Sequence, residues 1–327
     1  MSPEGFLADV LSAPHRLSAL LDAYAGTGSP LDSVATRDVE RVLFLGMGSS
    51  RFAALAAASR LRARGVDAFA ELSSTGAPSL PRRGTLVIGI SASGATVETV
   101  EALARHRGVS PTVAITNRPG SAIEYAADVA LPLLAGDEAG GVACVSFQAT
   151  LAVLLLLCGR LVGESVAEAL RPAVDASRAL RDGRSEWLEP LVELVRPAHT
   201  VYTIAPDERI SSALQSALML REGPRVAADA TETGDWLHVD VYLSRHPGYT
   251  ALLYPGSRFD AGVMDWARKR GSTIVAVGAP VVGAATTVGY PHAGDPLVAT
   301  LAEAGVAELL AAELWLSRGD PGSAASV

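Results

Sequence analysis

Short apolar runs alternate with longer stretches of helical periodicity along most of this chain. In the first half, such runs predict five strands, at 41–46, 67–71, 85–91, 111–116 and 128–133. The stretches 52–61 and 97–106 between them have the apolar spacing of helices. Runs that are apolar on both faces are typical of parallel strands covered by helices on each side. The pattern therefore predicts an α/β fold, with a parallel sheet sandwiched between helices.

The alternation begins again in the second half. Strands are predicted there at 200–204, 225–229, 249–254 and 272–277, and helices at 211–221 and 297–316. Both halves also share a short motif in which a glycine follows an acid by five residues. It reads Glu71 to Gly76 in the first half and Asp229 to Gly234 in the second, an offset of 158 residues. We interpret the two halves as an internal duplication of one α/β domain.

The domain organisation follows from these patterns. Residues 1–38 are expected to form an N-terminal helical segment, punctuated by Pro14. We place the first α/β domain at 39–164, a helical connection at 165–194 and the second domain at 195–327.

Composition excludes several classes of protein. Hydrophobic residues make up 49% of the 327, enough for a large core, so disorder is excluded as the main state. The net charge of −8 and the lack of a basic block argue against a nucleic-acid partner. The apolar run 149–158 is too short to cross a bilayer and predicts a buried helix rather than a membrane protein. Two cysteines in apolar surroundings and an N-terminus without a basic region favour the cytoplasm.

Two loops carry the polar groups that could bind a ligand. Gly48, Ser49 and Ser50 directly follow the first strand, where parallel sheets bind ligands beside helix N-termini. The loop resembles a dinucleotide fingerprint only superficially, because Arg51 stands where the third glycine belongs. It can hold an oxyanion, or its serines can cap the helix.

The second loop, at 91–96, follows the most apolar strand. It reads Ser91-Ala-Ser93-Gly94-Ala-Thr96, with three hydroxyls and a glycine that permits close approach of the backbone. Beside a positive helix terminus, such a loop can bind phosphate without a lysine or arginine. A single hydroxyl here would indicate only an N-cap. The absence of a Walker lysine argues against a nucleoside triphosphate, and we predict no cofactor.

These loops resemble the sugar isomerase (SIS) domain family. The Ser-x-Ser-Gly-x-Thr loop after a Gly-x-Ser-Ser loop carries the resemblance, as does the segment 135–143 before a long apolar helix. The duplicated arrangement is similar to the isomerase half of glucosamine-6-phosphate synthase and to stand-alone amino-sugar-phosphate deaminases. The resemblance implies two tandem SIS domains that bind a phosphorylated hexosamine. It implies that Val142 and Ala143 contribute to substrate binding alongside the two hydroxyl loops.

The resemblance also implies a catalytic pair. Glu222 ends a Leu-x-Leu-basic run, and His238 follows it by 16 residues, as in the family. Glu222 would then move the C2 proton, and His238 would open the sugar ring from the second subunit of a homodimer. The residue types suit these roles. Ring opening needs a group that titrates near neutrality, such as histidine, and C2 deprotonation needs a carboxylate of raised pKa. Alternatively, Glu222 is merely exposed and His238 caps a loop. The other histidines lack metal-ligand spacing, so we predict no metal.

The chain also departs from the family pattern. The synthase's lysine near the C-terminus has no counterpart in the tail 317–327, and Cys144 and Ser146 lie where the family typically has serine and lysine. One extra glycine is present at 140–141. The only lysine is Lys269, so a covalent imine with the protein is not expected.

The predicted function is the processing of glucosamine 6-phosphate or N-acetylglucosamine 6-phosphate by ring opening and C2 proton abstraction. A deaminase or isomerase is the first hypothesis. A dehydratase (lyase) that eliminates the C3 hydroxyl of an N-acetylated substrate, and a deglycase, are the alternatives. A non-catalytic sugar-phosphate sensor is the hypothesis from another class, and the presence of both Glu222 and His238 argues against it. The sequence leaves open which hexosamine phosphate is used.

Overall fold

The structure is a computed structural model, and it describes residues 1–318. The chain forms two compact units. The first sheet unit comprises residues 15–137 and 145–171, and the second sheet unit comprises 1–14, 138–144 and the residues from 172 on. Both units are thus discontinuous in sequence, unlike the consecutive domains proposed above, and the last of those domains includes 319–327, outside the described residues.

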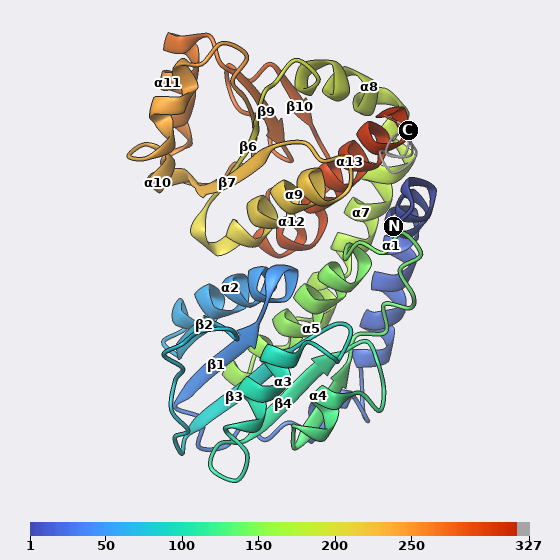
Figure 1. The fold of residues 1–327 in the computed structure, drawn as a ribbon, viewed down its shortest axis with the longest axis vertical. Helices are drawn as coiled ribbons and strands as arrows, with labels where there is room; N and C mark the ends of the chain where they lie inside the picture. Colours follow the sequence, from blue (N-terminus) through green and yellow to red (C-terminus); the bar gives the residue numbers. More distant parts are fainter. Residues whose placement is uncertain (319–327) are drawn as a thin grey trace, which may run out of the picture. The chain divides into compact units, whose positions relative to one another are not determined.

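The first sheet unit contains a five-stranded parallel sheet in the order β2-β1-β3-β4-β5 (Figure 1). Its strands are β1 (Arg41–Gly46), β2 (Asp67–Leu72), β3 (Thr85–Ile90), β4 (Thr112–Thr116) and β5 (Val129–Pro132). Every residue of β3 and β4 is buried, as expected for central strands covered on both faces.

Helices cover this sheet. They are α2 (Gly48–Arg62), α3 (Val97–Ala104), α4 (Ala122–Tyr125), α5 (Val145–Val162) and α6 (Ala167–Leu170), with a short 3-10 helix, η1 (Pro30–Ser33). α2 packs on β1, β2 and α5, whereas α3 packs on β1, β3 and α4. By length and composition α5 could cross a membrane, but 83% of it is buried inside the protein. The prediction of a buried core helix over the run 149–158 is therefore confirmed.

The second sheet unit contains the other parallel sheet, in the order β10-β9-β8-β6-β7 (Figure 1). Its strands are β6 (Val201–Ala205), β7 (Ala228–Glu232), β8 (Thr250–Leu253), β9 (Thr273–Val277) and β10 (Thr286–Val288). Renumbered from β6, this order is that of the first sheet, so the predicted α/β architecture with two repeated parallel sheets is confirmed. β10 was missed in the sequence because three residues are too few to show a period.

The helices of the second unit precede and surround its sheet. They are α7 (Pro172–Asp182), α8 (Arg184–Val195), α9 (Ile210–Glu222), α10 (Thr233–Trp236), α11 (Asp260–Arg270), α12 (Pro296–Ala302) and α13 (Ala304–Arg318), with 3-10 helices η2 (Asp207–Arg209) and η3 (Asp240–Arg245). α9 packs on β6, β7 and α13. The core under α10 and α11 includes Trp236, whose indole N–H donates to the Tyr249 hydroxyl at 2.8 Å.

The N-terminal helix α1 (Pro3–Tyr24) runs through Pro14, where the sequence indicated a break. A proline cannot donate to the carbonyl four residues earlier, which here belongs to Val10. Arg181 supplies the missing hydrogen bond, because its Nε donates to the Val10 carbonyl oxygen at 2.6 Å. A long-range contact therefore lets the helix continue.

β7 begins at Ala228, three residues after the predicted start of this strand at 225. Arg225 has a φ of 58°, and the Val226 N–H bonds the Leu220 carbonyl, so the chain is still turning out of α9 at this point. Asp229 is consequently the second residue of β7, whereas Glu71 is the penultimate residue of β2. Glu71 and Asp229, which the sequence motif aligned at an offset of 158 residues, therefore do not occupy equivalent positions in the two sheets. The repeated strand order does not depend on this motif.

Candidate functional site

The hydroxyl loop at residues 91–96 joins the carboxyl end of β3 to α3 in the first sheet unit. The Ser91 hydroxyl lies 2.9 Å from the Thr96 hydroxyl and 3.4 Å from that of Ser93. Ser91 is buried and Ser93 is exposed, so the cluster reaches from the interior to the surface. Among the described contacts, the Thr96 side chain does not cap α3, which disfavours the simple N-cap interpretation of this hydroxyl.

Gly94 gives this loop its shape. Its φ of 68° is a conformation that only glycine adopts without strain, and a Cβ there would lie 2.1 Å from the Ser121 hydroxyl. The loop is drawn inward by the hydrogen bond from the Gly94 N–H to the Ser91 carbonyl. The glycine thus allows the backbone to fold tightly between Ser91 and Thr96.

The other hydroxyl loop, at residues 48–50, lies at the same edge of the same sheet. β1 pairs directly with β3, and Gly48, Ser49 and Ser50 form the first turn of α2 just beyond β1. Within the described contacts, Met47 provides no side-chain cap for α2. The structure thus brings the two predicted phosphate loops to neighbouring strand ends, where the N-termini of two helices favour an anion.

The remaining predicted site residues belong to the second sheet unit. Val142 is buried and Ala143 half-buried in the segment 138–144. The Ala143 carbonyl accepts a hydrogen bond of 2.7 Å from Nε2 of Gln215, a fully buried residue of α9. Gln215 and Glu222 are two helical turns apart on α9, so the segment lies along the side of the helix that carries Glu222.

Glu222 is the last residue of α9 and is half-buried. Burial raises the pKa of its carboxyl group above the ordinary glutamic acid value, Arg225 opposes this rise, and the negative charge of Glu138 adds to it. A carboxylate with a raised pKa is a stronger base than an exposed one. Glu222 is therefore electrostatically suited to accept a proton.

His238 is exposed and follows α10, beyond the carboxyl end of β7. α9 connects the parallel strands β6 and β7, so it runs back along the sheet and ends near the start of β7. Glu222 and His238 therefore lie toward opposite ends of β7. A single chain does not place these two side chains next to each other.

The second sheet unit has loops equivalent to the two hydroxyl loops, but its own side chains occupy them. Arg209, after β6, forms a buried ion pair of 2.5 Å with Glu303 and also donates to the Pro255 carbonyl in the loop after β8. In that same loop the Gly256 N–H donates to the Asp260 carboxylate at 2.7 Å. Groups in both of these loops are thus paired with carboxylates of the chain itself.

Sequence reasoning missed the residues that hold the segment 138–144. Oδ1 of Asp9 accepts from the Ala139 N–H at 3.0 Å, and its Oδ2 accepts from the Gly140 N–H at 2.7 Å. The one sequence feature that could have indicated a structural role for Asp9 is its position, as a polar residue, on the apolar side of α1. Gly140 is required because a Cβ would lie 2.4 Å from the Phe6 backbone, which gives a structural role to one glycine of the 140–141 pair.

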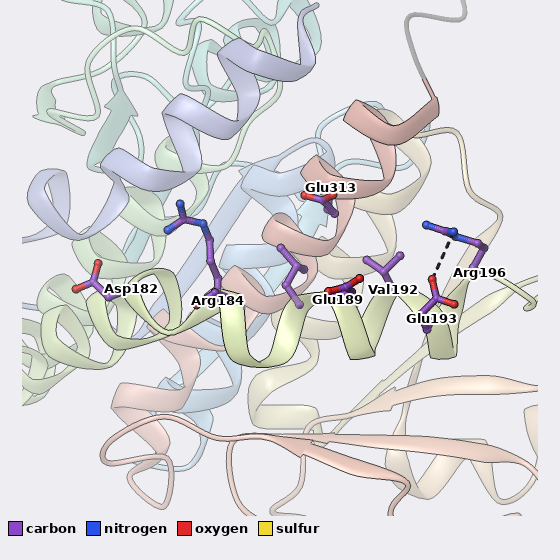
Figure 2. Close-up of a pocket in the computed structure, with 9 residues that line it drawn as sticks. Asp182, Arg184, Glu189, Val192, Glu193, Arg196 and Glu313 are labelled. Carbon is purple, nitrogen blue, oxygen red and sulfur yellow. Dashed lines mark ion pairs between the residues drawn. The ribbon is translucent and has the colours of Figure 1, made fainter.

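An open groove of about 660 Å³ lies elsewhere on the second unit, along α8 and the end of α13 (Figure 2). Its charged lining consists of Asp182, Arg184, Glu189, Glu193, Arg196 and Glu313. Arg196 pairs with Glu193 at 3.4 Å, so the remaining charges are mainly negative and do not favour a phosphate. No predicted site residue lines it. Within residues 1–318, no group of three His, Cys, Asp or Glu is placed to hold a metal ion.

Residues 36–159 match the SIS domain family model. Over 166 residues the chain is 32% identical to the glutamine–fructose-6-phosphate aminotransferase (isomerizing) of Pyrobaculum aerophilum, covering 48% of this chain and 27% of that protein. With the enzyme of the same name from Thermococcus kodakarensis it shares 27% identity over 295 residues, covering 84% of this chain and 48% of the relative. The chain thus spans less than half the length of these curated relatives.

Solved structures share the fold over nearly the whole chain. The C-terminal domain of glucosamine-fructose-6-phosphate aminotransferase from Francisella tularensis superposes with a TM-score of 0.84 at 17% identity, covering 95% of both chains. Glucosamine-6-phosphate deaminase from Thermotoga maritima gives 0.74 at 20% identity, covering 96% of this chain and 95% of that one. Tagatose-6-phosphate ketose/aldose isomerase from Escherichia coli gives 0.74 at 17%, covering 97% and 90%.

Proposed function

We propose that this protein, a SIS-domain protein of tandem SIS fold, is an enzyme that processes a phosphorylated sugar. The observation that carries the proposal is the pair of hydroxyl loops at the ends of β1 and β3. They offer clustered hydroxyls, a glycine-shaped turn and two helix N-termini to one anion. The names of the similar proteins support the same class, since each acts on a sugar phosphate.

The finer proposal is a hexosamine 6-phosphate substrate, most simply glucosamine 6-phosphate. The hydroxyl loops hold the phosphate, and Val142 and Ala143 are assigned to substrate binding by the resemblance to the SIS family. His238 transfers the proton that opens the ring and exposes the C1 aldehyde. Glu222 then takes the proton from C2, the electron pair forms the C1–C2 double bond, and the former aldehyde oxygen takes up a proton from solvent to give an enaminol.

The enaminol determines the product. Protonation at C1 gives a ketose imine, and addition of water to C2 releases ammonia and leaves the ketose 6-phosphate. This outcome is a deaminase coupled to isomerisation. If the nitrogen is acylated, it leaves poorly, and expulsion of the C3 hydroxyl as water becomes the competing outcome of a lyase. The amine state of the substrate thus decides between the two reactions.

We also propose that the enzyme works as a homodimer in the cytoplasm. Glu222 and His238 lie at opposite ends of β7, so a complete pair requires His238 from a second subunit. The cytoplasmic assignment rests on the chain having only two cysteines, Cys144 and Cys158, both of them buried.

Mass spectrometry after incubation tests the proposal. Pure protein is mixed in turn with glucosamine 6-phosphate, N-acetylglucosamine 6-phosphate and fructose 6-phosphate, with Glu222→Gln as the control enzyme. Loss of ammonia from the first substrate supports the deaminase, and loss of water from the second supports the lyase. Saturable binding of these sugars without turnover would instead indicate a sensor.

A further inference from the structure

The segment 138–144 is held by the first turns of α1, which belong to the same compact unit. Asp9 is only 7% exposed, and its two carboxylate oxygens accept from successive backbone N–H groups, those of Ala139 at 3.0 Å and Gly140 at 2.7 Å. Two acceptors on one rigid group fix the orientation of the peptide as well as its distance. An asparagine could not do the same, because its NH₂ group would face one of the two donors.

Close packing of the two backbones strengthens this attachment. A Cβ on Gly140 would lie 2.4 Å from the Phe6 backbone, and a Cβ on Gly5 would lie 2.9 Å from the backbone of Ala139. The Gly140 carbonyl also accepts from the Ser2 N–H at 3.2 Å. The start of α1 and the segment therefore touch backbone to backbone, with no side chain between them.

The other end of the segment is attached to α9. Gln215 donates from Nε2 to the Ala143 carbonyl at 2.7 Å, and Gln215 is completely buried. Only Gly141 and Val142 lie between Gly140 and Ala143, and Val142 is itself buried. A stretch of two residues that is fixed at both ends has few conformations open to it. The position of Val142 and Ala143 therefore depends on the contacts of Asp9 as well as on those of Gln215.

We propose that Asp9 is a positioning residue for the substrate, because it fixes the backbone at Val142 and Ala143 in the conformation that binds the phosphorylated sugar. The link to the substrate rests on the proposed function, whereas the attachment of the segment to α1 does not. α1, which the sequence pattern assigned to a separate N-terminal segment, thereby becomes part of the substrate site. Without Asp9, binding must also order the segment, and this cost lowers the affinity.

Two substitutions weaken the attachment from opposite sides. Asp9→Asn preserves the size of the side chain and removes one of the two acceptors. Gly140→Ala introduces a methyl group against the Phe6 backbone. Asp22→Asn is the matched control, since it makes the same change at an exposed residue of the same helix, whose carboxylate pairs with Arg171 at 2.5 Å and not with the segment.

The first measurement is amide hydrogen exchange of the full-length protein, followed by mass spectrometry, and it needs no substrate. In Asp9→Asn and Gly140→Ala, peptides that cover 138–144 should exchange at least about tenfold faster than in the wild type, because the N–H groups held by Asp9 are released. Peptides that cover the hydroxyl loop 91–96 should keep the wild-type rate in every variant. Asp22→Asn should leave both regions unchanged.

The second measurement is steady-state kinetics with glucosamine 6-phosphate. Asp9→Asn should raise KM about tenfold and leave kcat within about twofold, because the segment contributes to binding and not to proton transfer. The affinity for inorganic phosphate should stay at the wild-type value, since the hydroxyl loops belong to the other unit. A purely structural role of Asp9 would lower the melting temperature and the amount of active enzyme without changing KM.

A wild-type exchange rate at 138–144 in Asp9→Asn, or an equal acceleration in Asp22→Asn, overturns the proposal, and so does faster exchange with an unchanged KM. If Asp9→Asn does not fold, Gly140→Ala decides by the same two measurements. A wild-type protein that is inactive on every sugar phosphate would refute the proposed function, and with it the link to the substrate. The exchange rates would still decide whether Asp9 fixes the segment.

Discussion

At the scale of single residues, Ser93 is the exposed hydroxyl of the phosphate loop. Ser93→Ala should weaken binding of glucosamine 6-phosphate by roughly 1–3 kcal/mol, because a charge-assisted hydrogen bond to the phosphate is lost. Isothermal calorimetry measures this change. Binding of unphosphorylated glucosamine should remain weak and unaltered. Ser74→Ala, at an exposed serine outside the loop, is the control, and equal affinity of the wild type for both sugars would contradict the assignment.

Glu222 carries the second prediction at this scale. Glu222→Gln preserves the shape of the side chain and removes the base, so turnover should fall by about 10²–10⁴-fold while phosphate-driven binding persists. In heavy water, the wild type should incorporate deuterium at C1 or C2 and the variant should not. Full activity of the variant would assign the proton transfer to another group.

The pH dependence follows from the same carboxyl group. A general base acts when ionised, so activity is lost as the pH falls through its pKa. Burial raises the pKa of Glu222, and this moves the acidic limb of kcat/KM to a pH above the usual glutamic acid value. A profile of kcat/KM from pH 4 to pH 8, roughly the range around reference carboxyl and histidine pKa values, measures that limb. A limb at the value of an exposed glutamic acid would contradict the assignment.

At the scale of elements, the turn between β3 and α3 depends on Gly94. Gly94→Ala places a side chain at a φ of 68° and against the Ser121 hydroxyl, so the loop must open. The backbone conformation alone costs roughly 1–2 kcal/mol, and phosphate affinity should fall at least about tenfold. Gly76→Ala is the matched control, because a Cβ there meets no atom within 4 Å. Comparable losses in both variants would indicate general destabilisation.

At the scale of the whole molecule, complementation tests the shared site. Mixtures of inactive Glu222→Ala and inactive His238→Ala should regain activity, because one site of a heterodimer receives both intact residues. Up to about one quarter of wild-type activity is expected after random subunit exchange, following the logic of symmetric dimers. No recovery, with exchange verified by mass spectrometry, would place both residues in a site formed by one chain.

Stoichiometry is the second prediction for the whole molecule. The two sheets have the same strand order, yet Arg209, Glu303 and Asp260 fill the loops of the second sheet. Calorimetric titration should therefore give one sugar phosphate per chain. Two equivalent sites per chain would show that these internal contacts open to admit a ligand.

The sequence alone determined the alternation of strands and helices, the repetition of the sheet and the position of the hydroxyl loops. These are local properties. A buried strand or helix face shows its spacing of apolar residues within a few positions, and the polar groups at a helix N-terminus lie next to it in the sequence. The apolar run 149–158 could be identified as a buried helix for the same reason. Gly94 was identifiable because a tight turn requires glycine at the turn itself.

Only the tertiary structure decided how the segment 138–144 is held. Asp9 reaches it from 131 residues away, and Gln215 from 72. The same applies to Arg181, which lets α1 pass Pro14, and to the Arg209–Glu303 pair, whose members are 94 residues apart. Hydrogen bonds between such distant residues produce no recognisable pattern in the sequence, because each one depends on how whole helices and strands pack together. The polar groups of the hydroxyl loops could therefore be identified from the sequence, whereas the contacts that hold the segment 138–144 could not.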